Sequence, residues 1–279
     1  AFSSVENFVG GPLADVFRLQ AGSTPTWMVV DGGAGPNDSI EITGDADMKL
    51  TNAIVEVRGG LNQNLAILNF ESGALSGGAS ANVLDAFFFP GNVTLRGFGG
   101  DDKLIGGQGD DSLRGDAGSD VLIGNEGNEV IFGGDGDDLL VGATGNDHLS
   151  GEKGRDILEG GSGTDVLRGG DGEDILISGS AYGLGTYYGS DTERNDIRAA
   201  WSDTSLTYEQ RVVAIRDTGV GSGTPSSRLT VGYSVFADQA FDELSGDADR
   251  DWFFATTVSV NSIDLFTDRQ LDEDLTLLN

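Results

Sequence analysis

The chain has 279 residues and no cysteine, and 46 acidic against 16 basic side chains give it a net charge of −30 at pH 7. This charge argues against nucleic acid and against an anionic membrane surface as partners. No apolar run reaches the roughly 18 residues of a membrane span, so no membrane insertion is predicted. Without cysteine, and with one histidine, zinc and copper lack their usual ligands.

Residues 1–96 contain degenerate copies of a nine-residue pattern, separated by short apolar runs. Copies lie at 10–18 and 77–85, and a third begins at 59–64 with Asn where stronger copies have an acidic residue. Asn keeps the turn but lacks the formal charge, so we expect these coils to stand without a metal ion. We interpret residues 1–96 as degenerate β-helix coils, continuous with the segment that follows.

Residues 97–177 are nine consecutive nine-residue units of the form G-x-x-G-x-D-x-L-x, without insertion or deletion. Glycine holds the first and fourth places of every unit, and the eighth place is Leu except at Ile131. Such a fixed period is the signature of stacked repeats. The sixth place is acidic throughout, at Asp102, Asp111, Asp120, Glu129, Asp138, Asp147, Asp156, Asp165 and Asp174.

The repeat predicts an all-β fold, a parallel β-helix or β-roll solenoid. Glycine at two places suggests backbone angles that other residues avoid, so the first six residues of each unit are expected to form a turn. The last three favour a strand, whose eighth-place side chain points inward while the seventh and ninth point outward. Two units make one coil, and coils stack about 4.8 Å apart.

Stacking predicts a metal site at the sixth place, because neighbouring carboxylates repel unless a cation lies between them. Carboxylates and glycine-turn carbonyls supply hard oxygen ligands in the number that suits Ca²⁺ better than Mg²⁺. Alternate units share a side, and filling every gap on both sides gives roughly seven calcium ions. The side chain of Glu129 is one methylene longer, so the sites that it shares are expected to be distorted or empty. The two columns are Asp102, Asp120, Asp138, Asp156 and Asp174, and Asp111, Glu129, Asp147 and Asp165.

This repeat resembles that of the RTX, or haemolysin-type calcium-binding, family. The resemblance implies a calcium-binding β-roll in which the sixth-place carboxylates are metal ligands. It also implies a secreted or cell-surface bacterial protein, exported unfolded by type I secretion and folded by extracellular calcium. The chain opens at Ala1 without an initiator Met or a signal peptide, so we expect a fragment or a processed product.

After Ile177 the period breaks, and residues 178–279 predict a C-terminal capping module. Helices are expected at about 192–217, where Thr207 begins a capping box, and the nonapeptide returns for one coil at 237–254. The tail resembles one found in large secreted RTX-repeat proteins of bacteria. The module therefore combines a small helical insertion with a last repeat coil.

The outward seventh and ninth places differ between the two sides of the array. On the side of Asp102, Lys103 and Glu159 are the polar exceptions among ten positions. An exposed apolar strip of this length needs cover, and we expect residues 192–217 to fold back onto it. A homodimer or an upstream segment of the same protein is the alternative. The strip consists of Ile105, Val121, Ile123, Leu139, Val141, Ile157, Ile175 and Ile177.

The sequence therefore predicts a non-enzymatic, calcium-stabilised structural region. Two alternatives stay open: an adhesive module that binds a glycan or a cell-surface ligand, and the C-terminal part of a polysaccharide lyase or epimerase. The second needs basic residues and carboxylates together on residues 1–96. The basic side chains there are Arg18, Lys49, Arg58 and Arg96.

Overall fold

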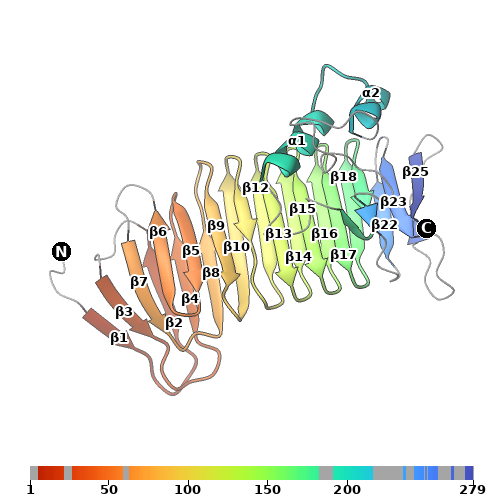
Figure 1. Ribbon diagram of the computed structural model, residues 1–279. Coiled ribbons are helices and arrows are strands. Elements are labelled where there is room, and N and C mark those ends of the chain that lie inside the picture. The colour runs from red at the N-terminus through yellow and green to blue at the C-terminus, as the bar shows by residue number, and fades with distance from the viewer. Residues whose placement is uncertain are drawn as a thin grey trace. The chain divides into compact units, whose positions relative to one another are not determined.

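The computed structural model describes residues 6–21, 27–58, 63–181, 191–215, 235–236, 242–247, 249, 251–256, 265–266 and 274–278. Strands dominate these residues, and nearly all of them pair in parallel sheets (Figure 1). The predicted all-β solenoid is confirmed. The chain divides into two compact units, residues 1–127 and 128–279.

The first unit contains two sheets, with strand orders β1-β3-β7-β6-β5-β9-β11-β13 and β2-β4-β8-β10-β12. Among the described strands of this unit, β6 runs antiparallel to both β5 and β7. These antiparallel hairpins interrupt the parallel winding of the degenerate β-helix coils that we expected for residues 1–96. The bounds are β1 Glu6–Val9, β2 Val16–Gln20, β3 Trp27–Asp31, β4 Ser39–Thr43, β5 Asp47–Thr51, β6 Ile54–Arg58, β7 Gln63–Leu68, β8 Ser72–Ser76, β9 Val83–Phe88, β10 Asn92–Gly99, β11 Lys103–Ile105, β12 Ser112–Ala117 and β13 Val121–Glu126.

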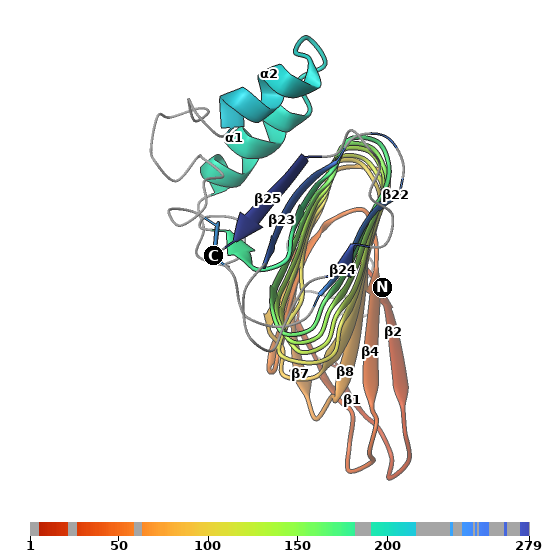
Figure 2. The same ribbon diagram turned by 90° about the vertical axis from the view of Figure 1, so that its right-hand side faces the viewer.

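The second unit contains the strand orders β15-β17-β19-β23-β25 and β14-β16-β18-β22-β24, and a short antiparallel pair, β20 with β21. Figure 2 shows helices α1 and α2 outside the coil, on the side of β23 and β25. The bounds are β14 Val130–Asp135, β15 Leu139–Thr144, β16 His148–Lys153, β17 Ile157–Ser162, β18 Val166–Asp171, β19 Ile175–Ile177, β20 Ser180–Ala181, α1 Asp191–Trp201, α2 Tyr208–Val213, β21 Val235–Phe236, β22 Glu243–Asp247, β23 Trp252–Thr256, β24 Leu265–Phe266 and β25 Asp274–Leu278.

The core is a ladder of eighth-place side chains. Leu104 pairs with Leu122 in the first unit, and Leu140 pairs with Leu158 in the second. A buried Leu of this kind contributes roughly 1.5–3 kcal/mol, so every coil adds a similar stabilising step. The inward orientation is confirmed, because exposure is at most 2% for Leu104, Leu113, Leu122, Ile131, Leu140, Leu149, Leu158, Leu167 and Leu176.

The expected six-residue turn is wrong, because the strands run further than predicted. β15 covers the last three places of one unit and the first three of the next, so the turn shrinks to the fourth to sixth places. The fourth-place Gly145 has a φ of 134°, which glycine adopts at no steric cost. The first-place Gly142 is needed for space instead, since a Cβ there would lie 2.6 Å from the Gly160 carbonyl oxygen.

The coil expected at 237–254 extends the stack of the second unit. Leu244 of β22 pairs with Leu167, and Phe253 of β23 pairs with Leu176. The inserted helical segment therefore does not disturb the register, although the step between paired positions grows from 18 to 77 residues. Residues 237–241 of this coil lie outside the described residues.

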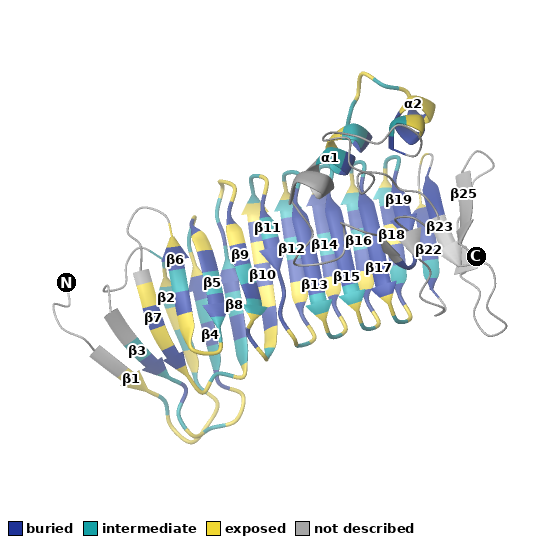
Figure 3. Cartoon of the chain, in the orientation of Figure 1, coloured by how far each residue is buried: buried dark blue, intermediate teal, exposed yellow. Residues whose placement is uncertain are grey.

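The apolar strip is shielded from solvent, as we expected for an apolar surface of this length. None of its eight side chains is more than 9% exposed. The buried run along β15 and β17 differs from the alternating burial of β14 and β16 (Figure 3). Glu159, a polar exception within the strip, is buried as well.

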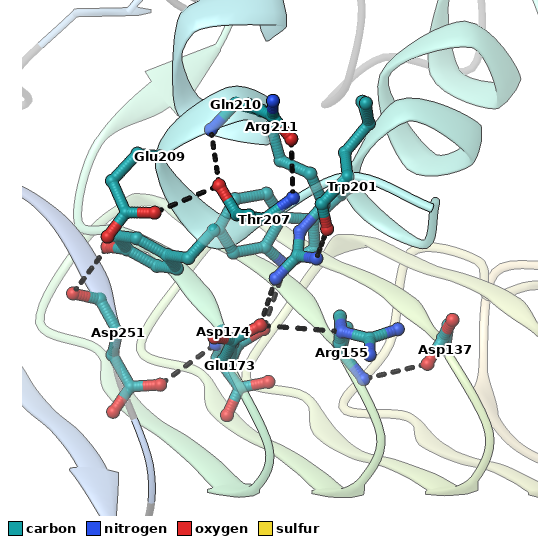
Figure 4. A network of polar contacts seen from close by, with 12 residues as sticks. Asp137, Arg155, Glu173, Asp174, Trp201, Thr207, Glu209, Gln210, Arg211 and Asp251 are labelled. Atoms are coloured by element: carbon teal, nitrogen blue, oxygen red, sulfur yellow. Dashed lines mark hydrogen bonds and ion pairs between the residues drawn. The ribbon is translucent and has the colours of Figure 1, made fainter. Parts of the chain in front are cut away.

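α1 and α2 contact the last coils of the second unit through a polar network (Figure 4). The Trp201 indole N–H donates to the Glu173 carbonyl oxygen at 2.9 Å. The buried Arg211 forms an ion pair with the Glu173 carboxylate, and the Tyr208 hydroxyl donates to the Asp251 carbonyl oxygen at 3.2 Å. The expected helical segment therefore folds back onto its own unit, and residues 216–217 lie outside the described residues.

Candidate metal centre

The sixth-place carboxylates form hydrogen-bonded columns. Oδ1 of Asp156 accepts the backbone N–H of Asp138 at 2.8 Å, and Oδ1 of Asp174 accepts that of Asp156 at 2.8 Å. All nine predicted ligands are at most 2% exposed. In each column contact, the hydrogen bond holds one carboxylate oxygen of the accepting residue in place. The same contact, at 2.7–2.9 Å, joins Asn82 to Asp102, Val93 to Asp111, Asp102 to Asp120, Glu129 to Asp147, and Asp147 to Asp165.

The second carboxylate oxygen is the candidate ligand for a metal ion. The Oδ2 atoms of four columnar residues are buried and have no hydrogen-bond partner within the described part of the chain. A buried carboxylate oxygen without a partner is costly unless a cation or a proton compensates it. The four residues are Asp102, Asp147, Asp156 and Asp174.

The space beside the Asp156 oxygen suits an oxygen-coordinated cation. A Cβ on Gly151 would stand well inside contact distance of Asp156 Oδ2 and 2.6 Å from the carbonyl oxygen of Gly169, in the next coil. Carboxylate and carbonyl oxygens therefore face one space that no side chain fills, which is the donor set of calcium. Among the described residues no three His, Cys, Asp or Glu side chains gather around a metal position. A cation bound there would need backbone carbonyls to complete its coordination.

Two kinds of turn can be distinguished at the sixth place. In a closed turn, the backbone N–H of the second place donates to the sixth-place side chain: Gly107 donates to Asp111 Oδ2 at 2.6 Å. In an open turn, the sixth-place Oδ2 has no such partner and the second-place residue has a positive φ. Open turns at the four residues above have Phe98, Ala143, Glu152 and Gly170 in second place.

The closed turn separates Asp111 from the other predicted ligands. Its second oxygen already accepts a backbone N–H, as does that of Asp15, which binds the N–H of Gly11 at 2.6 Å. Asn82 has the same arrangement with Gly78, at 2.8 Å. In these coils a hydrogen bond satisfies the second oxygen, which in the open turns is left for a cation, and the ligand role of Asp111 stays a prediction.

Two columnar carboxylates were missed by the sequence prediction. Oδ1 of Asp242 accepts the N–H of Asp165 and Oδ1 of Asp251 accepts that of Asp174, both at 2.8 Å. Both residues are fully buried and extend the columns beyond Asp174. Each residue occupies the sixth place of a nonapeptide copy within 237–254, so the sequence could have predicted its role. The ligand prediction was limited to the uninterrupted repeats of 97–177 and therefore omitted both. The count of roughly seven ions therefore stays a prediction.

Burial makes these carboxyl groups weak acids when no cation is present. Desolvation raises the pKa of Asp102 to about 7, and that of Asp156 to about 8. The pKa of Asp174 also lies well above its ordinary value, because of desolvation and the neighbouring carboxylates of Asp156 and Asp251. Charged and buried together, these groups require compensation at neutral pH.

These pKa shifts predict that the calcium-free protein is stabilised by acid. The unfolded carboxyl titrates near 3.8 and the folded Asp156 near 8, so the folded state holds more protons in between and loses stability as pH rises. Thermal melting of calcium-free protein should therefore be highest near pH 5 and fall toward pH 8. With saturating calcium the trend should weaken or reverse, because protons compete with the cation. A calcium-free melting temperature that rises over this range would contradict the prediction.

Glu129 gives a second testable prediction. Its backbone N–H keeps the column intact by donating to Asp147 Oδ1 at 2.8 Å, and its side chain is buried. We expect Glu129→Asp to increase the bound calcium or the calcium-dependent melting temperature, because the shorter carboxylate matches the other units. Native mass spectrometry and thermal melts measure both, with Asp147→Glu as a control that should act in the opposite direction. Unchanged stoichiometry and melting would refute the idea.

Comparison with known proteins supports calcium as the ion that the repeats bind. Residues 90–113, 105–140 and 141–176 match the family model of the RTX calcium-binding nonapeptide repeat, which spans four copies. No match to a curated protein was found. The matched segment covers the columns from Asp102 to Asp174 and stops before the C-terminal module, so the resemblance of the tail stays a prediction.

Proposed function

Because the chain carries RTX calcium-binding nonapeptide repeats over residues 90–176, we propose that it is a calcium-stabilised structural region of a secreted or cell-surface protein. The observation that supports this most is the set of buried Oδ2 atoms without a hydrogen-bond partner, at Asp102, Asp147, Asp156 and Asp174. We infer no catalytic role for the array. The carboxylates hold cations, and the cations hold the coils together.

The proposed mechanism couples calcium binding to folding. The sites need two stacked coils, so they do not exist in the unfolded chain, and the binding free energy becomes folding free energy. Extracellular calcium modules bind with dissociation constants of about 0.1–1 mM. Cytosolic calcium would then leave the array unfolded and fit for export, and extracellular calcium would fold it. No helix among the described residues is long and apolar enough to cross a membrane.

A calcium titration tests this function. The β-signal in circular dichroism should appear cooperatively at about 0.1–1 mM calcium, and magnesium at the same concentration should not replace it. A chain that is already folded at submicromolar calcium, or that responds equally to magnesium, would contradict a folding switch that distinguishes cytosol from exterior.

A second candidate function, ligand binding, is favoured by a pocket on β5, β6 and β9. The basic residues that the lyase alternative required are present there, but each is paired: Lys49 with Asp85 at 3.2 Å, and Arg58 with Glu56 at 2.7 Å. Paired charges offer neighbouring donors and acceptors, which suit the hydroxyl groups of a sugar better than proton abstraction. The pocket is lined by Asp47, Met48, Lys49, Glu56, Arg58, Val83 and Asp85.

A glycan-binding experiment separates this candidate from a purely structural role. Lys49→Ala should weaken binding to immobilised oligosaccharides at least about tenfold, the loss expected for a charged hydrogen bond. Arg18→Ala is the matched control, since Arg18 forms an exposed ion pair with Glu41 outside the pocket. Folded protein that binds no oligosaccharide would leave only the structural role.

A further inference from the structure

A turn before the matched repeats has the features of the metal-binding ones. The stretch 32–38, GGAGPND, has glycine at the first, second and fourth places, but its Asp comes one residue later than in the nonapeptide. This insertion takes Asp38 out of phase with the repeat. From their sequence, these coils are predicted to stand without a metal ion.

Asp38 belongs to a carboxylate column of its own. Its Oδ1 accepts the backbone N–H of Asp15 at 2.8 Å, and its own N–H donates to Glu71 Oε2 at 2.7 Å. These contacts repeat the arrangement of the array, with chain separations of 23 and 33 residues in place of 18. The three residues precede β2, β4 and β8, which are neighbours in one sheet.

The turn at Asp38 is open. Asp38 is fully buried, and its Oδ2 has no hydrogen-bond partner within the described part of the chain. Gly33, at the second place, has a φ of 102°, and its N–H donates to Asp31 Oδ1 at 2.9 Å instead of to Asp38. The preceding coil provides the contrast, because Asp15 is closed by Gly11.

The space beside Asp38 resembles that beside Asp156. A Cβ on Gly32 would lie 2.9 Å from Asp38 Oδ2 and well inside contact distance of the Asn69 carbonyl oxygen. The side-chain amide of Asn69 donates to Asp31 Oδ1 at 2.8 Å, which fixes this residue beside the space. A carboxylate oxygen and a carbonyl oxygen thus face each other across a position that no side chain fills.

We propose that Asp38 Oδ2 and the Asn69 carbonyl oxygen are ligands of a further calcium site, outside the RTX repeats. The donor set is oxygen only, a carboxylate together with a backbone carbonyl, which suits a hard divalent cation. The cation would join the coils before β4 and β8. Asp31 is a positioning residue, because it orients both Gly33 and Asn69. This site does not rest on the function proposed for the array.

Counting bound calcium in the 279-residue chain tests the site. Asp38→Asn keeps the size of the side chain and removes its charge, and native mass spectrometry at saturating calcium should find one ion fewer than in the wild type. The matched control is Asp15→Asn, whose closed turn needs no cation, so its count should equal that of the wild type. A wild-type count in folded Asp38→Asn protein would overturn the proposal.

Hydrogen exchange of the wild type keeps the proposal testable if Asp38→Asn fails to fold. Calcium should slow amide exchange in residues 31–43 and 69–76, as well as in residues 97–177. Unchanged exchange in the first two segments, while the array responds, would overturn the site without affecting the proposed function. A silent array would instead count against the proposed function.

Discussion

Removing calcium with a chelator should unfold residues 97–177 and abolish their cooperative melting. Four buried carboxylate oxygens in this array have no hydrogen-bond partner in the described structure, and desolvation already raises the pKa of Asp102 and Asp156 to about 7 and 8. At pH 7.5 the calcium-free chain must either protonate these groups or bury their charge, and both oppose folding. The expected effect is loss of most of the β-signal of the array.

Hydrogen exchange locates the effect of chelation along the chain. Amides of β15, β17 and β18 should lose protection completely, and returning calcium should restore it. Sodium chloride is the control for general charge screening, because it screens exposed charges well and buried ones poorly. An array that keeps its β-signal and melting temperature in chelator would show that hydrogen bonds and leucine packing suffice, and would remove the basis of the proposed function.

The period predicted the core and the columns because each depends on spacing. Leu140 and Leu158 lie one coil apart whatever their neighbours are, and the same holds for Asp138 and Asp156. The strand length was not predictable in this way, because stacking against neighbouring coils draws the first three places of each unit into the strand. A pattern within one unit carries no information on that contact.

Two acidic residues, Asp111 and Asp38, depart from what the repeat predicts, and in both cases the cause is the orientation of one backbone peptide at the second place of the turn. Asp111 obeys the repeat, yet its turn is closed by Gly107, and nothing in the composition of that unit distinguishes it from its open neighbours. Asp38 breaks the repeat by one residue, yet its turn is open. Backbone geometry at the second place, not agreement with the motif, decides whether an oxygen is left for a cation.

Trp201→Ala should strongly destabilise the C-terminal module. Trp201 is fully buried, donates a hydrogen bond to the Glu173 carbonyl oxygen, and packs edge-to-face with Tyr208 at 5.7 Å between ring centroids. Truncating a buried Trp costs about 3–5 kcal/mol. We expect the helices to detach and the apolar strip on β15, β17 and β19 to become accessible to a hydrophobic dye.

Chemical denaturation and dye binding, both at saturating calcium, measure this effect. Val213→Ala is the matched control, since Val213 lies on α2 but is exposed, and its free energy of unfolding should change by less than about 0.5 kcal/mol.

The oligomeric state, measured as a function of protein concentration, then separates the alternatives for covering the apolar strip. If Trp201→Ala protein dimerises where the wild type is monomeric, the helices protect the strip from self-association. If the wild type is itself a dimer and the variant neither binds dye nor loses stability, a second chain covers the strip and the folded-back helices are not its cover.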